Sequence, residues 1–191
     1  MRVIAGSHRG RRLCGPRGTT LRPTSDKVRE ALFSILGDRV SGSRFLDFYA
    51  GTGAVGIEAF SRGAGAVTFV EFDHEAAQLI RKNLTTCKLI DQADVRIASV
   101  NTFLQRADWW NGPYDLLFAD PPYASAAEQM ELLLTAWQPG LLTDDALVIL
   151  EQDSRTELPA SLDRVKMIRR YVYGDSALFI YGRSRTEPVA S

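Results

Sequence analysis

The sequence predicts a single α/β domain built on a doubly wound, mostly parallel β-sheet. Two observations carry this prediction. After Ser43, short apolar runs alternate with segments of helical periodicity, which is the pattern of parallel strands covered on both faces. The chain has 191 residues, which is enough for one domain with a proper core but not for two full domains.

Five strands are expected to alternate with helices in this region. The expected strands are Phe45–Phe48, Val67–Glu71, Val95–Ala98, Leu116–Ala119 and Leu147–Leu150, and the helices between them begin near Ala54, His74, Val100 and Ala126. Two further apolar runs, Val165–Tyr173 and Leu178–Tyr181, are separated only by Gly174–Ala177. That connection is too short for a helical crossover, so the last strand is expected to be antiparallel.

The residues before the sheet predict a basic extension and one helix. Val3–Ala5 and Leu13–Cys14 flank a Gly- and Arg-rich turn and are expected to form a small β-hairpin. A helix capped by Thr24 or Ser25 follows, and its apolar spacing leaves Arg29 pointing away from the core, available to a partner. The expected organisation is a basic arm (1–22), the main domain (23–184) and a disordered tail (185–191).

The charge is distributed unevenly along the chain. The net charge is zero, but residues 1–29 hold eight Lys or Arg and one acid, so they carry +7 and the remainder carries −7. A basic arm on an acidic body favours local contact with nucleic-acid phosphates, because each neutralised phosphate releases counterions. The alternative is a solvated basic tail.

The composition argues against a membrane protein and against a zinc site. No apolar run approaches the roughly 18 residues of a membrane span, and the N-terminus lacks the features of a secretory signal, so a cytoplasmic location is expected. Two cysteines and two histidines lack metal-ligand spacing, and no metal is expected. No extended apolar surface pattern is apparent, so we expect a monomer.

A glycine-rich turn between the first strand and its helix predicts a nucleotide-like cofactor. The run Asp47–Gly56 contains GxGxxG, whose glycines let the loop approach a ligand closely and turn sharply into the helix. Glu71 stands twenty residues after Gly51, at the end of the second strand, where a carboxylate can accept both hydroxyls of an adenosine ribose. Together these features predict an adenosine-containing cofactor.

Asp47 favours S-adenosylmethionine over a dinucleotide. It sits four residues before Gly51 at the mouth of the sheet, where its carboxylate can hold the ammonium of a methionine moiety, directly or through water. A dinucleotide has no such ammonium, and an acid near a pyrophosphate would be unfavourable. Asp47 as a helix or turn cap is the alternative.

The run Asp120–Tyr123, with sequence DPPY, follows the fourth strand and predicts the acceptor group. Ligands in such folds bind at the carboxyl ends of strands. An exocyclic amine on a base is a poor nucleophile, because its lone pair is conjugated into the ring. Asp120 and the Pro121 carbonyl can accept hydrogen bonds from this amine, and Tyr123 can stack on the base. The alternative is a rigid surface turn.

The sequence resembles the bacterial 16S ribosomal RNA guanine-N2 methyltransferases over nearly its full length. The matching motifs are Arg2–Gly6, Arg9–Arg11, Arg22–Phe33, Asp47–Gly53, Asp120–Tyr123 and Tyr173–Ser176. The resemblance implies a Rossmann-like class I methyltransferase fold with seven strands. It also implies methyl transfer from S-adenosylmethionine to N2 of one guanine in 16S rRNA, with an assembled small ribosomal subunit as the expected substrate.

The resemblance and the motifs together give the candidate site. The candidate catalytic residues are Asp120, Pro121 and Tyr123. The candidate cofactor contacts are Asp47, Tyr49, Gly51, Thr52, Gly53, Glu71, Phe72, Ser99 and Asp120. The candidate RNA contacts are Arg9, Arg11, Arg12, Arg22, Thr24, Lys27 and Arg29. The chain departs from the common pattern after the third strand, where Ala98–Asn101 has no acid for the adenine amine, so Ser99 or a backbone group takes that contact.

Three other functions stay open at this point. An NAD-type oxidoreductase would explain the glycine-rich turn but would leave Asp47, DPPY and the basic arm without a purpose. A non-catalytic RNA-binding assembly factor would be expected to show damage in the glycine-rich turn or in DPPY, and both are intact. DPPY also serves adenine-N6 and cytosine-N4 methylation, so the motif predicts the kind of nitrogen, and guanine depends on the resemblance.

Overall fold

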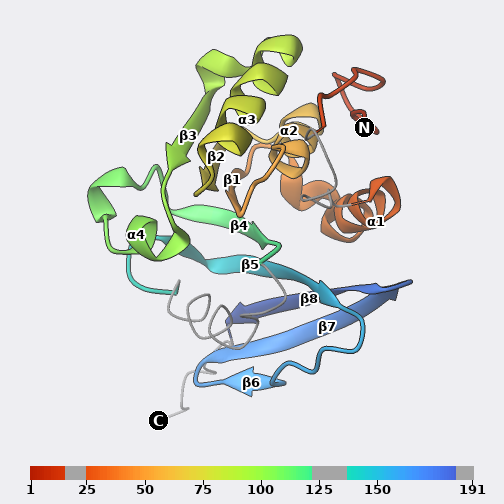
Figure 1. The fold of residues 1–191 in the computed structure, drawn as a ribbon. Coiled ribbons are helices and arrows are strands. Elements are labelled where there is room, and N and C mark those ends of the chain that lie inside the picture. The colour runs from red at the N-terminus through yellow and green to blue at the C-terminus, as the bar shows by residue number, and fades with distance from the viewer. Residues whose placement is uncertain (16–24, 122–136, 184–191) are drawn as a thin grey trace.

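A computed structural model describes residues 1–15, 25–121 and 137–183. Within them, eight strands form one sheet in the order β3-β2-β1-β4-β5-β8-β7-β6. Figure 1 shows this sheet as a twisted band, with α1, α2 and α3 on one side and α4 on the other. The predicted α/β class with a mostly parallel sheet is confirmed.

The first five strands are parallel to one another. They are β1 (Arg44–Phe48), β2 (Ala66–Glu71), β3 (Ala93–Ile97), β4 (Tyr114–Ala119) and β5 (Leu142–Asp153). The cores of β1, β2 and β4 coincide with the predicted apolar runs, because strands buried on both faces lack polar alternation. The edge strand β3 is only half-buried, and it begins two residues before the predicted Val95 and ends one residue before Ala98. The predicted Leu147–Leu150 covers only the centre of β5, since the polar residues at both ends of this strand conceal its length.

The last three strands complete the sheet in antiparallel fashion. They are β6 (Ser161–Leu162), β7 (Val165–Tyr173) and β8 (Ser176–Arg183). The last strand, β8, lies between β5 and β7 and is antiparallel to both, as predicted. The expectation of seven strands was one short: β6 is a two-residue exposed strand paired with the start of β7, and so short a segment has no apolar pattern to reveal it.

Among the described residues, one α-helix precedes the sheet and three join its parallel strands, and most begin where a side chain caps them. They are α1 (Asp26–Leu36), α2 (Ala54–Ser61), α3 (His74–Cys87) and α4 (Val100–Leu104). Ser25, Asp73 and Ser99 cap α1, α3 and α4 by accepting a hydrogen bond from a backbone N–H in the first turn. The helix expected near Ala126 and the tail from residue 185 lie outside the described residues.

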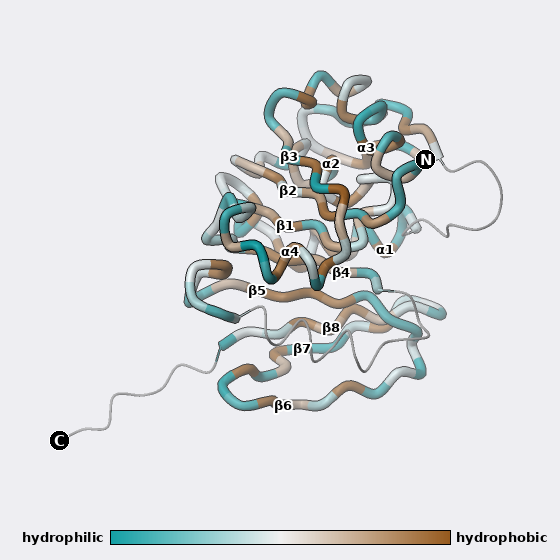
Figure 2. The backbone as a smooth tube through the Cα atoms, turned by 60° about the vertical axis from the view of Figure 1, so that its left-hand side comes forward, coloured by the Kyte–Doolittle hydropathy of each residue, from teal (hydrophilic) through white to brown (hydrophobic). Residues whose placement is uncertain are grey.

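Two apolar clusters fill the two faces of the sheet. On the face that α1, α2 and α3 cover, called the α1 face below, Phe33 and Ile80 pack with Phe45, Ile149 and other strand residues. On the opposite face, called the α4 face, Phe103 packs against Phe48 and the other side of the strands. Figure 2 shows hydrophobic residues along β4 and β5, at the centre of the sheet.

The described part of the N-terminal arm, residues 1–15, packs against the domain. Arg2 and Arg12 form a single antiparallel bridge, so the predicted hairpin is reduced to a loop held by a few backbone hydrogen bonds. Val3 and Leu13 are buried in the cluster of the α1 face. The basic arm is therefore a fixed part of the surface over at least these residues.

Candidate active site

Three carboxylates converge where three neighbouring strands end. β1 lies between β2 and β4, and these strands carry Asp47, Glu71 and, directly after β4, Asp120. Asp47 is 1% exposed, and burial raises its pKa well above the ordinary 3.8. The hydrogen bond from Gly56 opposes this rise, and the charges of Glu71 and Asp120 add to it. A cationic ligand at this carboxyl edge of the sheet would offset the repulsion among these carboxylates and favour the charged form of Asp47.

The three glycines of the GxGxxG turn have different structural roles. Gly51 and Gly53 both have positive φ, and a Cβ on Gly51 would meet only one atom within 4 Å, the Tyr49 carbonyl oxygen at 3.9 Å. The backbone at Gly51 is therefore open to a ligand. Gly56 lies against the sheet instead, and a Cβ there would stand 2.3 Å from Phe69 Cε1. Only glycine lets α2 approach β2 this closely.

Glu71 holds the glycine-rich turn in place. Its Oε2 accepts a hydrogen bond from the Gly51 N–H at 2.7 Å, and its Oε1 accepts one from the Asp73 N–H at 2.9 Å. Each oxygen keeps further lone pairs for another donor. The carboxylate is thus fixed beside the turn and keeps capacity for further hydrogen bonds.

Asp47 acts as a cap within the fold. Its Oδ2 accepts a hydrogen bond from the Gly56 N–H at 2.9 Å, in the first turn of α2, where the preceding Gly53 has no side chain to do so. The cap that the sequence left as an alternative is therefore present. It occupies one carboxyl oxygen and is compatible with an ammonium at the other.

The remaining candidate cofactor contacts differ in accessibility. Phe72 is 74% exposed beside Glu71, so it is not core packing. Tyr49 is half-buried against the α4 face, and burial raises its pKa to about 12. The Thr52 hydroxyl is buried and faces Met1 Sδ at 3.7 Å, so only the backbone of this residue is left for a ligand. The Ser99 hydroxyl caps α4 by accepting from the Thr102 N–H at 3.1 Å.

The DPPY motif is described only in its first half. Asp120 is partly exposed directly after β4, and Pro121 is buried next to it. Pro122 and Tyr123 lie outside the described residues. Phe118 and Ala119, the last residues of β4, pair with Asp47 and Phe48 of β1. This pairing places Asp120 at the same edge of the sheet as the glycine-rich turn.

Glu58 of α2 organises the arm, and sequence reasoning missed it. Its side chain is fully buried and accepts hydrogen bonds from the backbone N–H groups of Ile4 and Ala5 at 2.8 and 2.9 Å. It also forms ion pairs with Arg62 at 2.9 Å and with Arg29 at 3.8 Å. An acid in the apolar run Ala54–Phe60 was the signal that could have revealed it, because a buried charge requires partners.

Asn83 of α3 joins the arm to the glycine-rich turn, and it was missed as well. The fully buried side chain accepts from the Cys14 N–H at 2.7 Å, and its Nδ2 donates to the Cys14 carbonyl at 3.1 Å and to the Thr52 carbonyl at 2.9 Å. It shares the buried face of α3 with Ile80 and Leu84, and a polar side chain on an apolar helix face indicates such a role.

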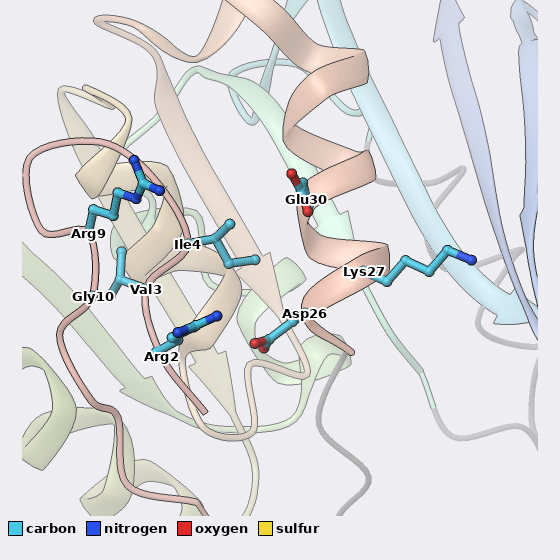
Figure 3. A pocket seen from close by; sticks show the side chains of 8 residues that line it. All are labelled: Arg2, Val3, Ile4, Arg9, Gly10, Asp26, Lys27 and Glu30. Carbon is cyan, nitrogen blue, oxygen red and sulfur yellow. The ribbon is translucent and has the colours of Figure 1, made fainter.

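The basic candidates for RNA contact divide into exposed and buried residues. Arg9, Arg12 and Lys27 are exposed, whereas Arg11 is partly buried and donates to the Thr86 carbonyl at 3.1 Å. A pocket of about 350 Å³, lined by both charged and apolar residues, lies between the arm and α1. Figure 3 shows Arg2 and Arg9 of the arm on one side of it and Asp26 and Glu30 of α1 on the other, with Lys27 pointing away. Arg22 and Thr24 lie outside the described residues.

The expectation that Arg29 is available to a partner was wrong. Its side chain is 0% exposed, and it donates to the Arg2 carbonyl at 2.6 Å and to Asp26 Oδ1 at 2.9 Å. Burial lowers its pKa from 12.5, and the charges of Asp26 and Glu58 oppose that change. Arg29 lies on the buried side of α1 with Leu32 and Phe33, and the arm packs against it there. It therefore stabilises the arm and does not contact a ligand directly.

Two negative findings apply to the described residues. None of their helices is both long and apolar enough to cross a membrane. Among the same residues, no group of three or more His, Cys, Asp and Glu side chains is placed to hold a metal ion.

Comparisons with known proteins identify the family. Residues 1–182 match the family described as conserved hypothetical protein 95. The chain is similar to the ribosomal RNA small subunit methyltransferase D of Escherichia coli strain K12, with 34% identity over 96% of this chain and 90% of that protein. It is 40% identical to the protein of the same name from Haemophilus influenzae, over 80% of this chain and 79% of that protein.

Solved structures share the fold. A hypothetical protein from Thermus thermophilus superposes with a TM-score of 0.81 at 33% identity, covering 94% of this chain and 98% of that one. At 13% identity, an RNA methyltransferase from Salinibacter ruber in complex with S-adenosyl-L-homocysteine shares the fold with a TM-score of 0.62, over 88% of this chain and 98% of that one. With the fold of S-adenosylmethionine-dependent methyltransferases and a family match over nearly its whole length, this chain belongs to the conserved hypothetical protein 95 family, together with the ribosomal RNA small subunit methyltransferases D.

Proposed function

We propose that this protein transfers a methyl group from S-adenosylmethionine to the exocyclic N2 amine of one guanine in 16S rRNA. The observation that carries the proposal is the convergence of Asp47, Glu71 and Asp120 at the ends of adjacent strands, beside an open glycine-rich turn. Two of these carboxylates suit the two ends of the cofactor, and the third suits the amine that accepts the methyl group.

The residues at this edge fit S-adenosylmethionine. Asp47 would hold the ammonium of the methionine moiety, because a desolvated carboxyl group gains most from a positive partner. Glu71, fixed by the Gly51 and Asp73 N–H groups, would accept the ribose hydroxyls, and the exposed Phe72 ring would cover the adenine. When bound, the cofactor supplies an electrophilic methyl group on sulfur, which the amine nitrogen takes as it gives up one proton.

Asp120 and Pro121 would bind and orient the amine. A hydrogen bond from the amine to the Asp120 carboxylate makes the nitrogen more tetrahedral, so that its lone pair is available along one direction. The Pro121 carbonyl would accept the second N–H, and the rigid proline backbone fixes that acceptor. Most of the rate enhancement would then come from alignment of the reacting atoms. Tyr123 would stack on the base.

The proposal of guanine as the target base, and of the small ribosomal subunit as the substrate, is supported by the family resemblance and by the charge of the arm. Guanine-N2 follows from the resemblance of the motifs to the 16S guanine methyltransferases. The exposed Arg9, Arg12 and Lys27 around the arm would contact phosphates. With few side chains to enclose a large RNA, we propose that an assembled small subunit in the cytoplasm is the substrate and that the protein acts as a monomer.

Transfer of radiolabelled methyl from S-adenosylmethionine to small subunits that lack the modification tests the proposal. Nucleoside analysis should find the label as N2-methylguanosine at one position of 16S rRNA. Label in N6-methyladenosine or N4-methylcytosine, or on DNA alone, would instead establish the alternative amino-methyltransferase. Binding of NAD in place of S-adenosylmethionine would establish the oxidoreductase.

Replacement of Asp120 tests the mechanism. Asp120→Ala should abolish turnover while the dissociation constant for S-adenosylmethionine, measured by calorimetry, stays within a few-fold of the wild-type value. This pair of results separates a catalytic role from loss of folding and from a non-catalytic assembly factor. Wild-type turnover in the variant would remove Asp120 from the mechanism.

A further inference from the structure

β7 is the most basic strand of the described sheet, and the function proposed above does not use it. With Arg164 just before it, the segment 164–173 contains four Lys or Arg residues and no acid. It also contains two tyrosines and two strongly exposed apolar residues, Ile168 at 57% and Val172 at 53%. Basic residues interleaved with aromatic rings are typical of surfaces that bind single-stranded nucleic acid.

The register of β7 places its tyrosines and one arginine on the same face. Residues directly opposite each other in an antiparallel pair lie on the same side of the sheet. Tyr171 pairs with Leu178 and Arg169 with Ile180, and both partners belong to the cluster of the α1 face. Tyr171 and Tyr173 also pack against that cluster. These three side chains therefore lie on the α1 face, at its outer border.

A β-bulge directs Arg169 to this face. Met167 pairs with Tyr181 and packs on the α4 face, and regular alternation would place Arg169 there as well. The register shift between Met167 and Arg169 inserts Ile168 as an extra residue, so that Arg169 turns to the α1 face. Lys166, opposite Gly182, lies on the same face as Arg169. The result is a row of two cations and two aromatic rings, with the exposed Ile168 beside Gly182 on the same face.

The two cations have no protein partner among the described residues. Lys166 and Arg169 are exposed, and neither side chain takes part in an ion pair or hydrogen bond with another described residue. Arg170 on the opposite face differs, because it donates to the Ser154 carbonyl and lies 5.3 Å from the centre of the Phe179 ring. Tyr171 and Tyr173 are half-buried, so that part of each residue is accessible.

The row ends at the same edge of the sheet as the active site. β4 and β5 are parallel, and β8 is antiparallel to both β5 and β7, so β7 runs in the direction of β4. Figure 1 shows the arrows of β4, β5 and β7 pointing the same way. Tyr173, at the end of β7, is therefore three strand spacings from the end of β4, or about 14 Å in the hydrogen-bonding direction.

We propose that this row, Lys166, Arg169, Tyr171 and Tyr173, is a second RNA-binding surface, which holds a single-stranded segment next to the target base. The cations would contact phosphates and the tyrosines would stack on bases. Charge complementarity favours RNA over a protein as the occupant. The row contains no acid, and its apolar side chains are interrupted by cations. The inference rests on the proposed rRNA substrate and adds a contact far from the basic arm.

The cations are tested by the double variant Lys166→Gln/Arg169→Gln. Its affinity for a 16S rRNA fragment that contains the target is measured by filter binding over a series of salt concentrations, with S-adenosylhomocysteine present. If two phosphate contacts are lost, the slope of log K against log salt should fall by about 1.4. The control is Arg39→Gln/Arg44→Gln, which removes two exposed charges at the opposite, amino edge of the sheet. Equal slopes in the two double variants would overturn the proposal.

The tyrosines are tested by a substitution that keeps the core contact but removes the aromatic ring. Tyr171→Leu should weaken RNA binding on the order of tenfold with an unchanged salt slope, and Tyr171→Phe should restore it. Equal binding by the leucine and phenylalanine variants would refute stacking. Melting temperatures of all variants identify any general loss of folding.

Two further comparisons separate the possible failures. If the double variant loses affinity for assembled subunits but not for naked RNA, the row faces a ribosomal protein and the RNA proposal is wrong. If the wild-type protein transfers no methyl group to 16S rRNA, the proposed function is wrong. Methyl transfer measures that failure, whereas the RNA-binding assays measure the failure of the second RNA-binding surface.

Discussion

Glu58→Gln tests whether one buried carboxylate fixes the basic arm to the domain. Glutamine keeps the shape of the side chain but replaces one oxygen with an amide NH2. In the structure each oxygen accepts from one arm N–H group, Oε2 from Ile4 and Oε1 from Ala5. Whichever way the new amide turns, one N–H donor of the arm faces another donor. The ion pairs with Arg29 and Arg62 lose their negative partner at the same time.

The magnitude follows from the burial of the partners. Removing one member of a buried pair costs about 3–5 kcal/mol, because the other charge is left in a low-dielectric site. Arg29 is 0% exposed but keeps Asp26 and the Arg2 carbonyl, and Arg62 is 21% exposed and can be solvated. We therefore expect the lower end, about 3 kcal/mol. For a chain of this size, that lowers the melting temperature by about 6–12 °C.

Thermal unfolding followed by circular dichroism measures this effect, and hydrogen exchange of the Ile4 and Ala5 amides localises it. The matched control is Glu30→Gln on the exposed side of α1, which should change the unfolding free energy by no more than about 0.5 kcal/mol. A melting temperature within a degree of wild type, with both arm amides still protected, would refute the assigned role of Glu58.

Two further predictions concern Gly56 of the glycine-rich motif and Asp47 of β1. Gly56→Ala should lower the unfolding free energy in urea by about 1–3 kcal/mol, because the new Cβ would stand 2.3 Å from Phe69 Cε1 and 2.9 Å from Val67 Cγ1. Gly15→Ala, where nothing lies within 4 Å, is the control, and equal stability of the two variants would contradict this reading. Asp47→Asn concerns pH: since the folded pKa of Asp47 is raised above 3.8, its contribution to stability is full below that pH and is lost as pH rises through the folded pKa. The cofactor-free variant should therefore lose less stability than wild type as pH rises above about 4. Parallel stability curves for the two proteins would show that Asp47 is not the group responsible.

The sequence alone determined the parallel part of the sheet and the position of the candidate site. Buried strands and glycine-rich turns have local signals, so the approximate strand cores and the order of Asp47, Glu71 and Asp120 could be predicted without the structure. Because these residues follow or end parallel strands, their meeting at one edge was implied by the fold class. The packing of Gly56 against Phe69 was not predicted, because it depends on how closely α2 approaches β2.

The tertiary structure decided which side chains remain accessible. Arg29 was expected to point away from the core, but it lies on the buried side of α1, where the Arg2 carbonyl of the arm and Glu58 of α2 are its partners. Asn83 likewise has a function only because Cys14 and Thr52 meet beside it. The bulge that turns Arg169 to the α1 face has no sequence signal of its own. Periodicity along a chain shows which face of an element is apolar, whereas packing between distant segments determines what covers the other face.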